Sequence, residues 1–114
     1  MKIIKTKNFP PGAYSTINLF GILFTKSNHL SDTTINHEKI HTAQMKEMWY
    51  IPFYLWYGIE YLIVRLFHKK QNDAYHDISF EEEAYNNQHD MEYLNKRKKF
   101  AWLDFIKPKS YEAV

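Results

Sequence analysis

The sequence of 114 residues contains no cysteine, and its formal net charge at pH 7 is only +2. The lack of cysteine excludes disulfides and thiolate zinc sites, so any metal ion must be held by histidine, glutamate or aspartate. The small net charge, with basic residues that are not gathered into one long run, argues against nucleic acid as an electrostatic partner. We therefore expect no nucleic-acid binding.

The first residues, MKIIKTKNFPPG, hold no apolar stretch of the length that a secretory signal peptide needs. We therefore expect a cytoplasmic protein, unless another segment attaches it to a membrane. The sequence also lacks internal repeats and any linker long enough to divide the chain. Because its contents of apolar (45%) and charged (25%) residues are ordinary for globular proteins, it predicts a single domain over residues 1–114.

The order of patterned segments predicts a small α+β domain. Residues 2–7 partly alternate lysine or threonine with isoleucine and are followed by the turn sequence FPPG, and residues 17–26 are rich in β-branched and aromatic residues. Together they predict a small antiparallel sheet with a bulge at Gly21. Four helices should follow: one capped by Asp32 or Thr33 and ending at Pro52, one from Pro52 to about Phe67, one capped by a Ser79–Glu82 box and running to residues 96–99, and a short one over residues 100–106.

Residues 50–67 form the longest apolar run and approach the length of a membrane span. Glu60 near the middle would cost a few kcal/mol in lipid, and the four tyrosines and one tryptophan favour an interface over the lipid interior. The pattern favours a core helix, with a helix on the surface of a membrane or partner as the alternative. The basic run KRKK at residues 96–99 favours a solvated helix end over attachment to an anionic membrane.

The stretch TINHEKIHTAQ, residues 34–44, holds two histidines four residues apart with a glutamate beside the first. On a helix, His37 and His41 lie about 40° apart, so both imidazoles can reach one metal ion from one face. Glu38 lies a further 100° round, where its carboxylate can serve a metal-bound water as general base. Because Ile40 and Gln44 share the histidine stripe, we expect the pair to face inward.

A catalytic zinc site usually takes a third protein ligand. The remaining histidines, His29, His68, His76 and His89, all lie in polar surroundings, and the acidic cluster SFEEEAY at residues 79–85 is the other source. Glu82 is explained by the capping box. Glu81 and Glu83 point about 200° apart on a helix, so at most one of them faces the metal, and periodicity alone does not decide between them.

The two motifs together resemble the gluzincin zinc metallopeptidases, in which an H-E-x-x-H helix is followed by a glutamate ligand on a second helix. The match covers residues 36–44 and 80–85, and the small size resembles the single-domain minigluzincins, which implies a zincin-like fold. By this resemblance Glu81 is the third zinc ligand. Tyr85 stands where the family carries an aspartate that supports the second histidine, so the phenol or Gln44 is expected to take that role.

The resemblance implies a zinc-dependent metallopeptidase that holds zinc through His37, His41 and Glu81 and uses Glu38 as general base. The substrate would be an extended peptide or protein that binds by strand addition along residues 19–26. The candidates for an oxyanion-stabilising side chain are Tyr75, His76, Tyr85 and His89. The alternatives are a non-catalytic or latent zinc-binding domain and a membrane-associated interaction protein.

Overall fold

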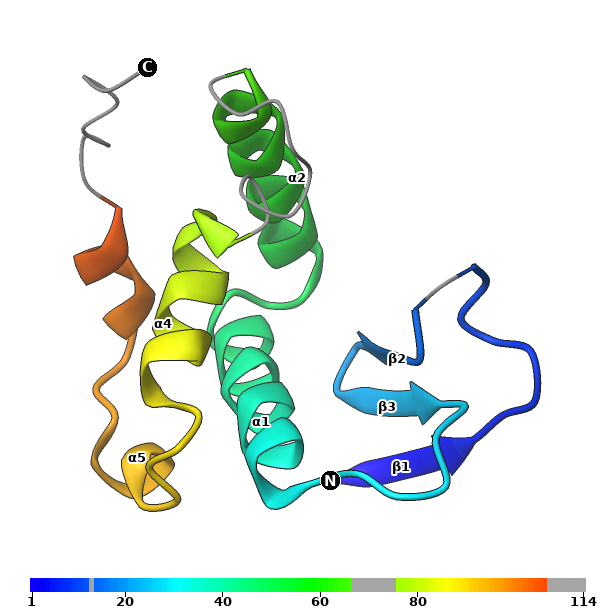
Figure 1. Cartoon of the computed structure of the whole chain (residues 1–114). Helices are drawn as coiled ribbons and strands as arrows, with labels where there is room; N and C mark the ends of the chain where they lie inside the picture. Colours follow the sequence, from blue (N-terminus) through cyan, green and yellow to red (C-terminus); the bar gives the residue numbers. More distant parts are fainter. Residues whose placement is uncertain (13, 67–75, 107–114) are drawn as a thin grey trace.

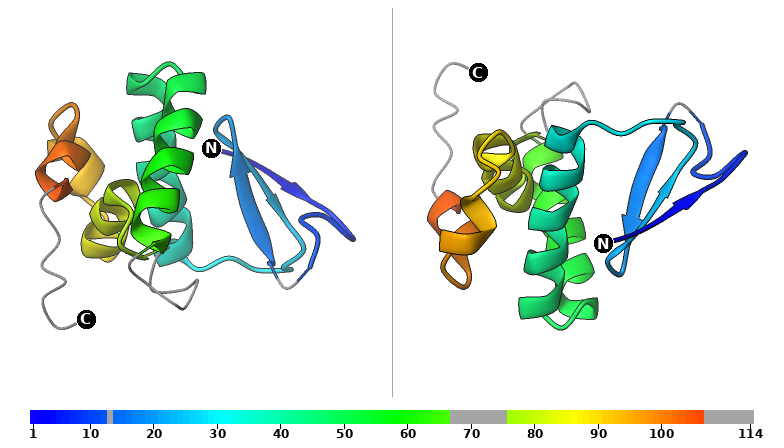
Figure 2. Two further views of the ribbon diagram at one scale, coloured as in Figure 1. Left: turned by 90° about the horizontal axis from the view of Figure 1, so that it is seen from above. Right: turned by 90° about the horizontal axis from the view of Figure 1, so that it is seen from below.

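The computed structural model describes residues 1–12, 14–66 and 76–106, which form a small α+β arrangement of a three-stranded mixed sheet and four α-helices (Figure 1). The strands are β1 (Lys2–Lys5), β2 (Thr16–Leu19) and β3 (Ile22–Thr25), and the helices are α1 (Asp32–Glu47), α2 (Ile51–Arg65), α4 (Ser79–Asn87), α5 (Tyr93–Lys96) and the 3-10 helix η1 (Ala101–Phe105). The sheet lies on one side of the α1–α2 pair, and α4, α5 and η1 lie on the other side (Figure 2).

The sheet is mixed, so the predicted antiparallel sheet is wrong. The strand order is β1-β3-β2, with β2 antiparallel and β1 parallel to β3. Phe20 and Gly21 both have positive φ values, 54° and 88°, and make a tight turn instead of the expected bulge. This turn joins β2 and β3 into a hairpin, in which β2 lies along one edge of β3. β1 lies along the other edge of β3, so the connection from β1 to β2 crosses from one side of β3 to the other.

The helix boundaries follow from local signals in α1 and α2. Ser31 caps α1, since its Oγ accepts a hydrogen bond from the backbone N–H of Thr34 at 3.1 Å. The cap therefore lies just before the two predicted positions, Asp32 and Thr33. Trp49 and Tyr50, with φ values of 60° and 62°, separate α1 from α2. Pro52 lies in the first turn of α2, as expected, because its missing N–H has no helical partner there.

Helix α4 ends earlier than predicted, and its start is held by a different group. The carboxylate of Glu60 on α2 accepts the backbone N–H of Ser79 at 3.0 Å and its hydroxyl at 2.7 Å, in place of the expected capping box with Glu82. This contact explains an acidic residue within an apolar helix. The basic run is also divided, because Arg97 turns into the interior while Lys96 and Lys98 pair with the surface residues Asp90 and Asp104.

The hydrophobic core lies where α1, α2, α4 and η1 meet. It consists of Met45, Phe53, Ile78, Phe80 and Trp102. Burial of side chains of this size stabilises the fold by roughly 1.5–3 kcal/mol each. Only one face of α2 joins this core, and in the described part of the chain no helix is long and apolar enough to cross a membrane.

Candidate metal centre

One face of α1 is buried although it is polar. His37 and His41 are only 8% and 5% exposed, and Asn36 and Gln44 beside them are buried as well. The helix places the two imidazoles one turn apart on the same side, and their Nε2 atoms are 3.1 Å from each other. The expectation that the histidine pair faces inward is confirmed.

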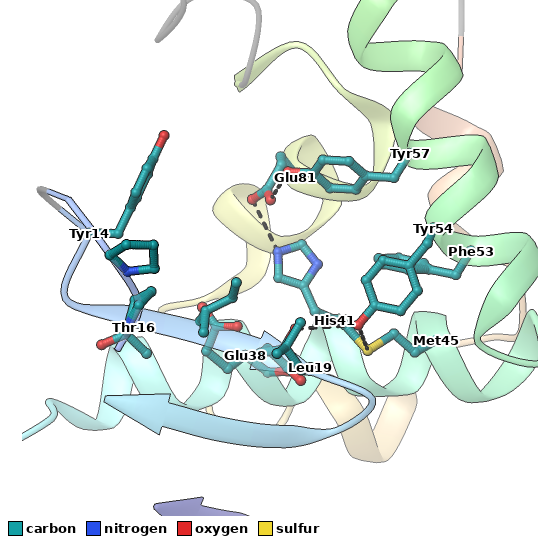
Figure 3. A pocket seen from close by; sticks show the side chains of 14 residues that line it. Tyr14, Thr16, Leu19, Glu38, His41, Met45, Phe53, Tyr54, Tyr57 and Glu81 are labelled. Carbon is teal, nitrogen blue, oxygen red and sulfur yellow. Dashed lines mark hydrogen bonds and ion pairs between the residues drawn. The ribbon is translucent and has the colours of Figure 1, made fainter. Parts of the chain in front are cut away.

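Glu81, in the first turn of α4, brings a carboxylate to the two histidines. Its Oε1 lies 3.1 Å from His41 Nε2 and 3.3 Å from His37 Nε2, and the residue is 2% exposed. Figure 3 shows the Glu81 carboxylate and the His41 ring directed toward each other. His41 and Glu81 are 40 positions apart in sequence, and the packing of α4 on α1 brings their ligand atoms and that of His37 to one point.

The spacing of these atoms fits a metal ion. Three ligands at about 2.0–2.1 Å from a tetrahedral ion lie roughly 3.3 Å apart. The three distances in this cluster are 3.1, 3.1 and 3.3 Å. Two imidazole nitrogens and a carboxylate oxygen are also a donor set that Zn²⁺ accepts. The buried side chains of His37, His41 and Glu81 can therefore hold a metal ion.

The second nitrogen of each imidazole is fixed by a glutamine. His37 Nδ1 lies 2.7 Å from Gln88 Oε1, and His41 Nδ1 lies 2.7 Å from Gln44 Oε1. An amide oxygen only accepts, so each Nδ1 donates, and each Nε2 is left to present its lone pair to a cation. Asn36 supports this arrangement, since its Nδ2 donates to the carbonyl oxygen of Gln88 at 2.8 Å.

Gln44 belongs to a buried polar network that runs away from the metal cluster. Its Nε2 donates to Glu83 Oε1 at 2.9 Å, and Glu83 in turn accepts a hydrogen bond from Tyr93 Oη at 2.6 Å. Arg97 pairs with both Glu83 and Glu47. Glu83 therefore points away from His37 and His41, toward the guanidinium of Arg97. Glu81 is the glutamate that faces the histidines.

Tyr85 does not support His41. Its ring packs edge-on against the ring of His37, with centroids 4.6 Å apart, and also lies against His76. Of the two side chains expected to replace the family aspartate, Gln44 is the one that contacts His41 Nδ1.

The cluster has strong internal electrostatics. Burial by itself raises the pKa of Glu81, but the charge of His41 and hydrogen bonds from both histidines and Tyr57 outweigh it and hold that pKa well below its usual range. Burial lowers the pKa of His41, and the nearby Glu81 carboxylate outweighs this and raises the pKa to about 9.

A cleft of about 460 Å³ opens beside the cluster, between β2, α1 and α2. His41, Glu81 and the half-buried Glu38 line it together with mainly apolar side chains, among them Leu19, Met45, Phe53 and Tyr54 (Figure 3). Tyr57 of α2 also reaches this cleft, and its hydroxyl donates to Glu81 Oε2 at 2.7 Å. The cleft thus gives a small molecule or chain segment access to two of the candidate ligands and to Glu38.

The strand that borders the cleft is β2, whereas the family resemblance implied residues 19–26. Thr16, Ile17, Asn18 and Leu19 line the cleft, and among the described residues β2 is an edge strand that pairs with β3 alone. β3 lies in the centre of the sheet and has both edges occupied, so it cannot accept a further strand. Only Leu19 of the expected stretch lies at the cleft.

No protein-family model, curated protein or solved structure matches this chain. The chemistry of the cluster therefore has to be argued from its own residues. Of the other histidines, His29, His76 and His89 are exposed and do not join the metal cluster, while His68 and Tyr75 lie outside the described residues. Gln88, Tyr57 and Glu83 were missed as supporting residues, because they come from distant elements and no local spacing marks them.

Proposed function

We propose that this chain is a zinc-dependent metallopeptidase of the gluzincin type, with a zincin-like domain. His37, His41 and Glu81 would hold the zinc ion, and Glu38 would serve as the general base. The observation that carries the proposal is the convergence of two histidine Nε2 atoms and one Glu81 oxygen within 3.3 Å of each other, beside a cleft that Glu38 also lines.

Zinc, when bound, supplies a Lewis acid that lowers the pKa of a coordinated water and polarises a carbonyl group. Glu38 accepts a proton from the attacking water as the new C–O bond forms, and it returns a proton to the leaving amine as the C–N bond breaks. Tyr57 holds the second oxygen of Glu81, so that the carboxylate keeps one orientation. His76, Tyr85 and His89 stay candidates for stabilising the oxyanion.

In this proposal Gln44 takes the place of the aspartate that supports the second histidine in the family. Gln44 is completely buried, and its amide is held by the carbonyl oxygen of Phe80 at 3.0 Å and by Glu83 at 2.9 Å. These two acceptors orient the amide so that its oxygen faces His41 Nδ1. Glu83 and Arg97 thus act as positioning residues for the metal ligand.

The proposed substrate is an extended peptide or protein segment laid along the edge of β2. An edge strand offers backbone groups for one more antiparallel or parallel partner, and its position at the cleft would carry that partner past His41 and Glu38. The apolar walls formed by Leu19, Met45 and Phe53 favour an apolar side chain beside the scissile bond.

A non-catalytic zinc-binding domain is the second candidate, favoured by the low exposure of all three ligands. A purely structural site has no need of Glu38. The test compares cleavage of casein by the wild type and by Glu38→Gln, with zinc content measured in both. We expect equal zinc content and a loss of roughly 10²–10⁴ in rate for the variant. Zinc-loaded wild type that cleaves no faster than Glu38→Gln would exclude the peptidase and leave the structural site.

A further inference from the structure

The outward face of α2 is apolar and exposed. Five side chains at helical spacing, each more than half exposed, define a stripe that we call the α2 stripe: Ile51, Leu55, Ile59, Leu62 and Leu66. Trp49, directly before the helix, is 83% exposed. Since α2 buries Phe53 and Val64 on the opposite side, the helix is apolar on both faces.

Nothing in the described part of the chain covers this stripe. Figure 2, seen from above, shows α2 in front of α1, with no other described element passing over it. Monomeric proteins rarely expose a contiguous apolar patch larger than a few hundred Å², and larger patches mark contact with a partner or a membrane. The α2 stripe is therefore a candidate for such a contact.

We propose that the α2 stripe docks on a lipid bilayer surface that contains anionic lipids. Of the exposed side chains of α2, only those of Trp56 and Arg65 can form hydrogen bonds, whereas a protein interface has about one hydrogen bond per 100–200 Å². Trp49 and Trp56, both exposed, adjoin the stripe, and tryptophan is enriched where membranes meet water.

The charges on α2 fit the same partner. Its single acidic residue, Glu60, turns inward to Ser79, while Arg65 is exposed in the last turn. No acidic side chain of α2 is therefore exposed where it would repel the negative potential of anionic lipids.

The helix lies on the membrane and does not cross it. Its 15 residues span about 22 Å, which is shorter than the roughly 30 Å of a hydrocarbon core. An in-plane helix buries its apolar face at the boundary of headgroups and acyl chains. Because Phe53, Tyr54 and Tyr57 on the other face line the cleft, docking would hold the cleft about one helix diameter, roughly 10 Å, from the bilayer.

The test is co-sedimentation of the full chain with vesicles of phosphatidylcholine and phosphatidylglycerol. The wild type is compared with a double variant, Leu55→Gln with Leu62→Gln, and with Leu103→Gln, which changes a half-exposed leucine of η1 away from the stripe. We expect the double variant to lose at least about tenfold in vesicle affinity, since two buried leucines are removed from lipid, and the control to match the wild type.

Circular dichroism and zinc content, unchanged in all three proteins, show that the variants fold. Absence of wild-type binding to the vesicles, or equal binding by the double variant, would overturn the proposal. Analytical ultracentrifugation without lipid tests a second copy as the partner. A wild-type dimer that the double variant dissociates, without vesicle binding, would also overturn it.

Discussion

Two neighbouring helices depart from ordinary burial in opposite directions. The inward face of α1 buries polar side chains such as His37, His41 and Gln44, while the outward face of α2 exposes Leu55 and Leu62. On α1 every buried polar group has a partner inside the protein, and the ligand atoms meet at one point. On α2 the apolar side chains have no cover in the described part of the chain. The α1 face can therefore hold a metal ion, whereas the α2 face leaves apolar side chains exposed to solvent.

The energetic logic differs between the two faces. A buried polar group that loses its partner destabilises the fold by about 1–3 kcal/mol, so substitutions on the α1 face should lower the free energy of unfolding. An exposed leucine contributes little to stability, so substitutions on the α2 stripe should leave the free energy of unfolding almost unchanged.

The largest effect is expected on metal affinity when Glu81 is removed. Glu81→Ala should weaken zinc binding by at least about a thousandfold, since it deletes one of three protein ligands. Isothermal titration with zinc measures the affinity, and circular dichroism checks the fold. Unchanged affinity in Glu81→Ala would refute the ligand assignment.

Arg97→Ala should lower the free energy of unfolding by about 3–5 kcal/mol, because it leaves Glu83 and Glu47 as buried carboxylates without their cation. The side chains of Arg97 and Glu83 are only 6% and 0% exposed. Urea denaturation measures the change. Lys98→Ala is the matched control, because Lys98 is 75% exposed in its pair with Asp104 and should cost less than about 1 kcal/mol. Equal costs in the two variants would contradict the buried network.

Gln44→Ala should reduce zinc affinity by about 10–100-fold, since it removes the acceptor that orients His41. Zinc titration at constant pH gives the value. A Gln44→Ala protein with wild-type affinity would show that Gln44 does not position the ligand.

The smallest effect is expected on the α2 stripe. Leu55→Gln should change the free energy of unfolding in lipid-free buffer by no more than about 0.5 kcal/mol. Urea denaturation again gives the value, beside Phe53→Ala on the buried face, which should cost about 3–5 kcal/mol. A loss of several kcal/mol in Leu55→Gln would mean that the stripe packs within the protein and that the comparison of faces is wrong.

The predictions that the structure confirms rest on the local spacing of residues along the sequence. His37 and His41 could be placed on one buried face because helical periodicity relates residues four apart. Pro52 marked the start of α2 because proline is favoured in a first turn. The inward direction of Glu81 came from a resemblance between motifs, since periodicity left Glu81 and Glu83 equivalent.

The missed features depend on contacts between distant segments. β1 pairs parallel to β3 because of the path taken between the strands, and no residue pattern within Lys2–Lys5 encodes that choice. Phe20 adopts a positive φ that its residue type does not favour, so the hairpin was read as a bulged strand. Glu60 contacts Ser79, and Gln88 contacts His37. These partners are far apart in sequence, so the spacing of residues within one helix does not predict the contacts.

Metal analysis of the purified full chain decides whether His37, His41 and Glu81 hold a zinc ion. We predict about one zinc ion per chain, its removal by a chelator, and a rise in the thermal midpoint when zinc is returned. His37→Ala should hold much less than one equivalent. A wild-type chain that takes up no zinc, or that carries iron in its place, would contradict the claim.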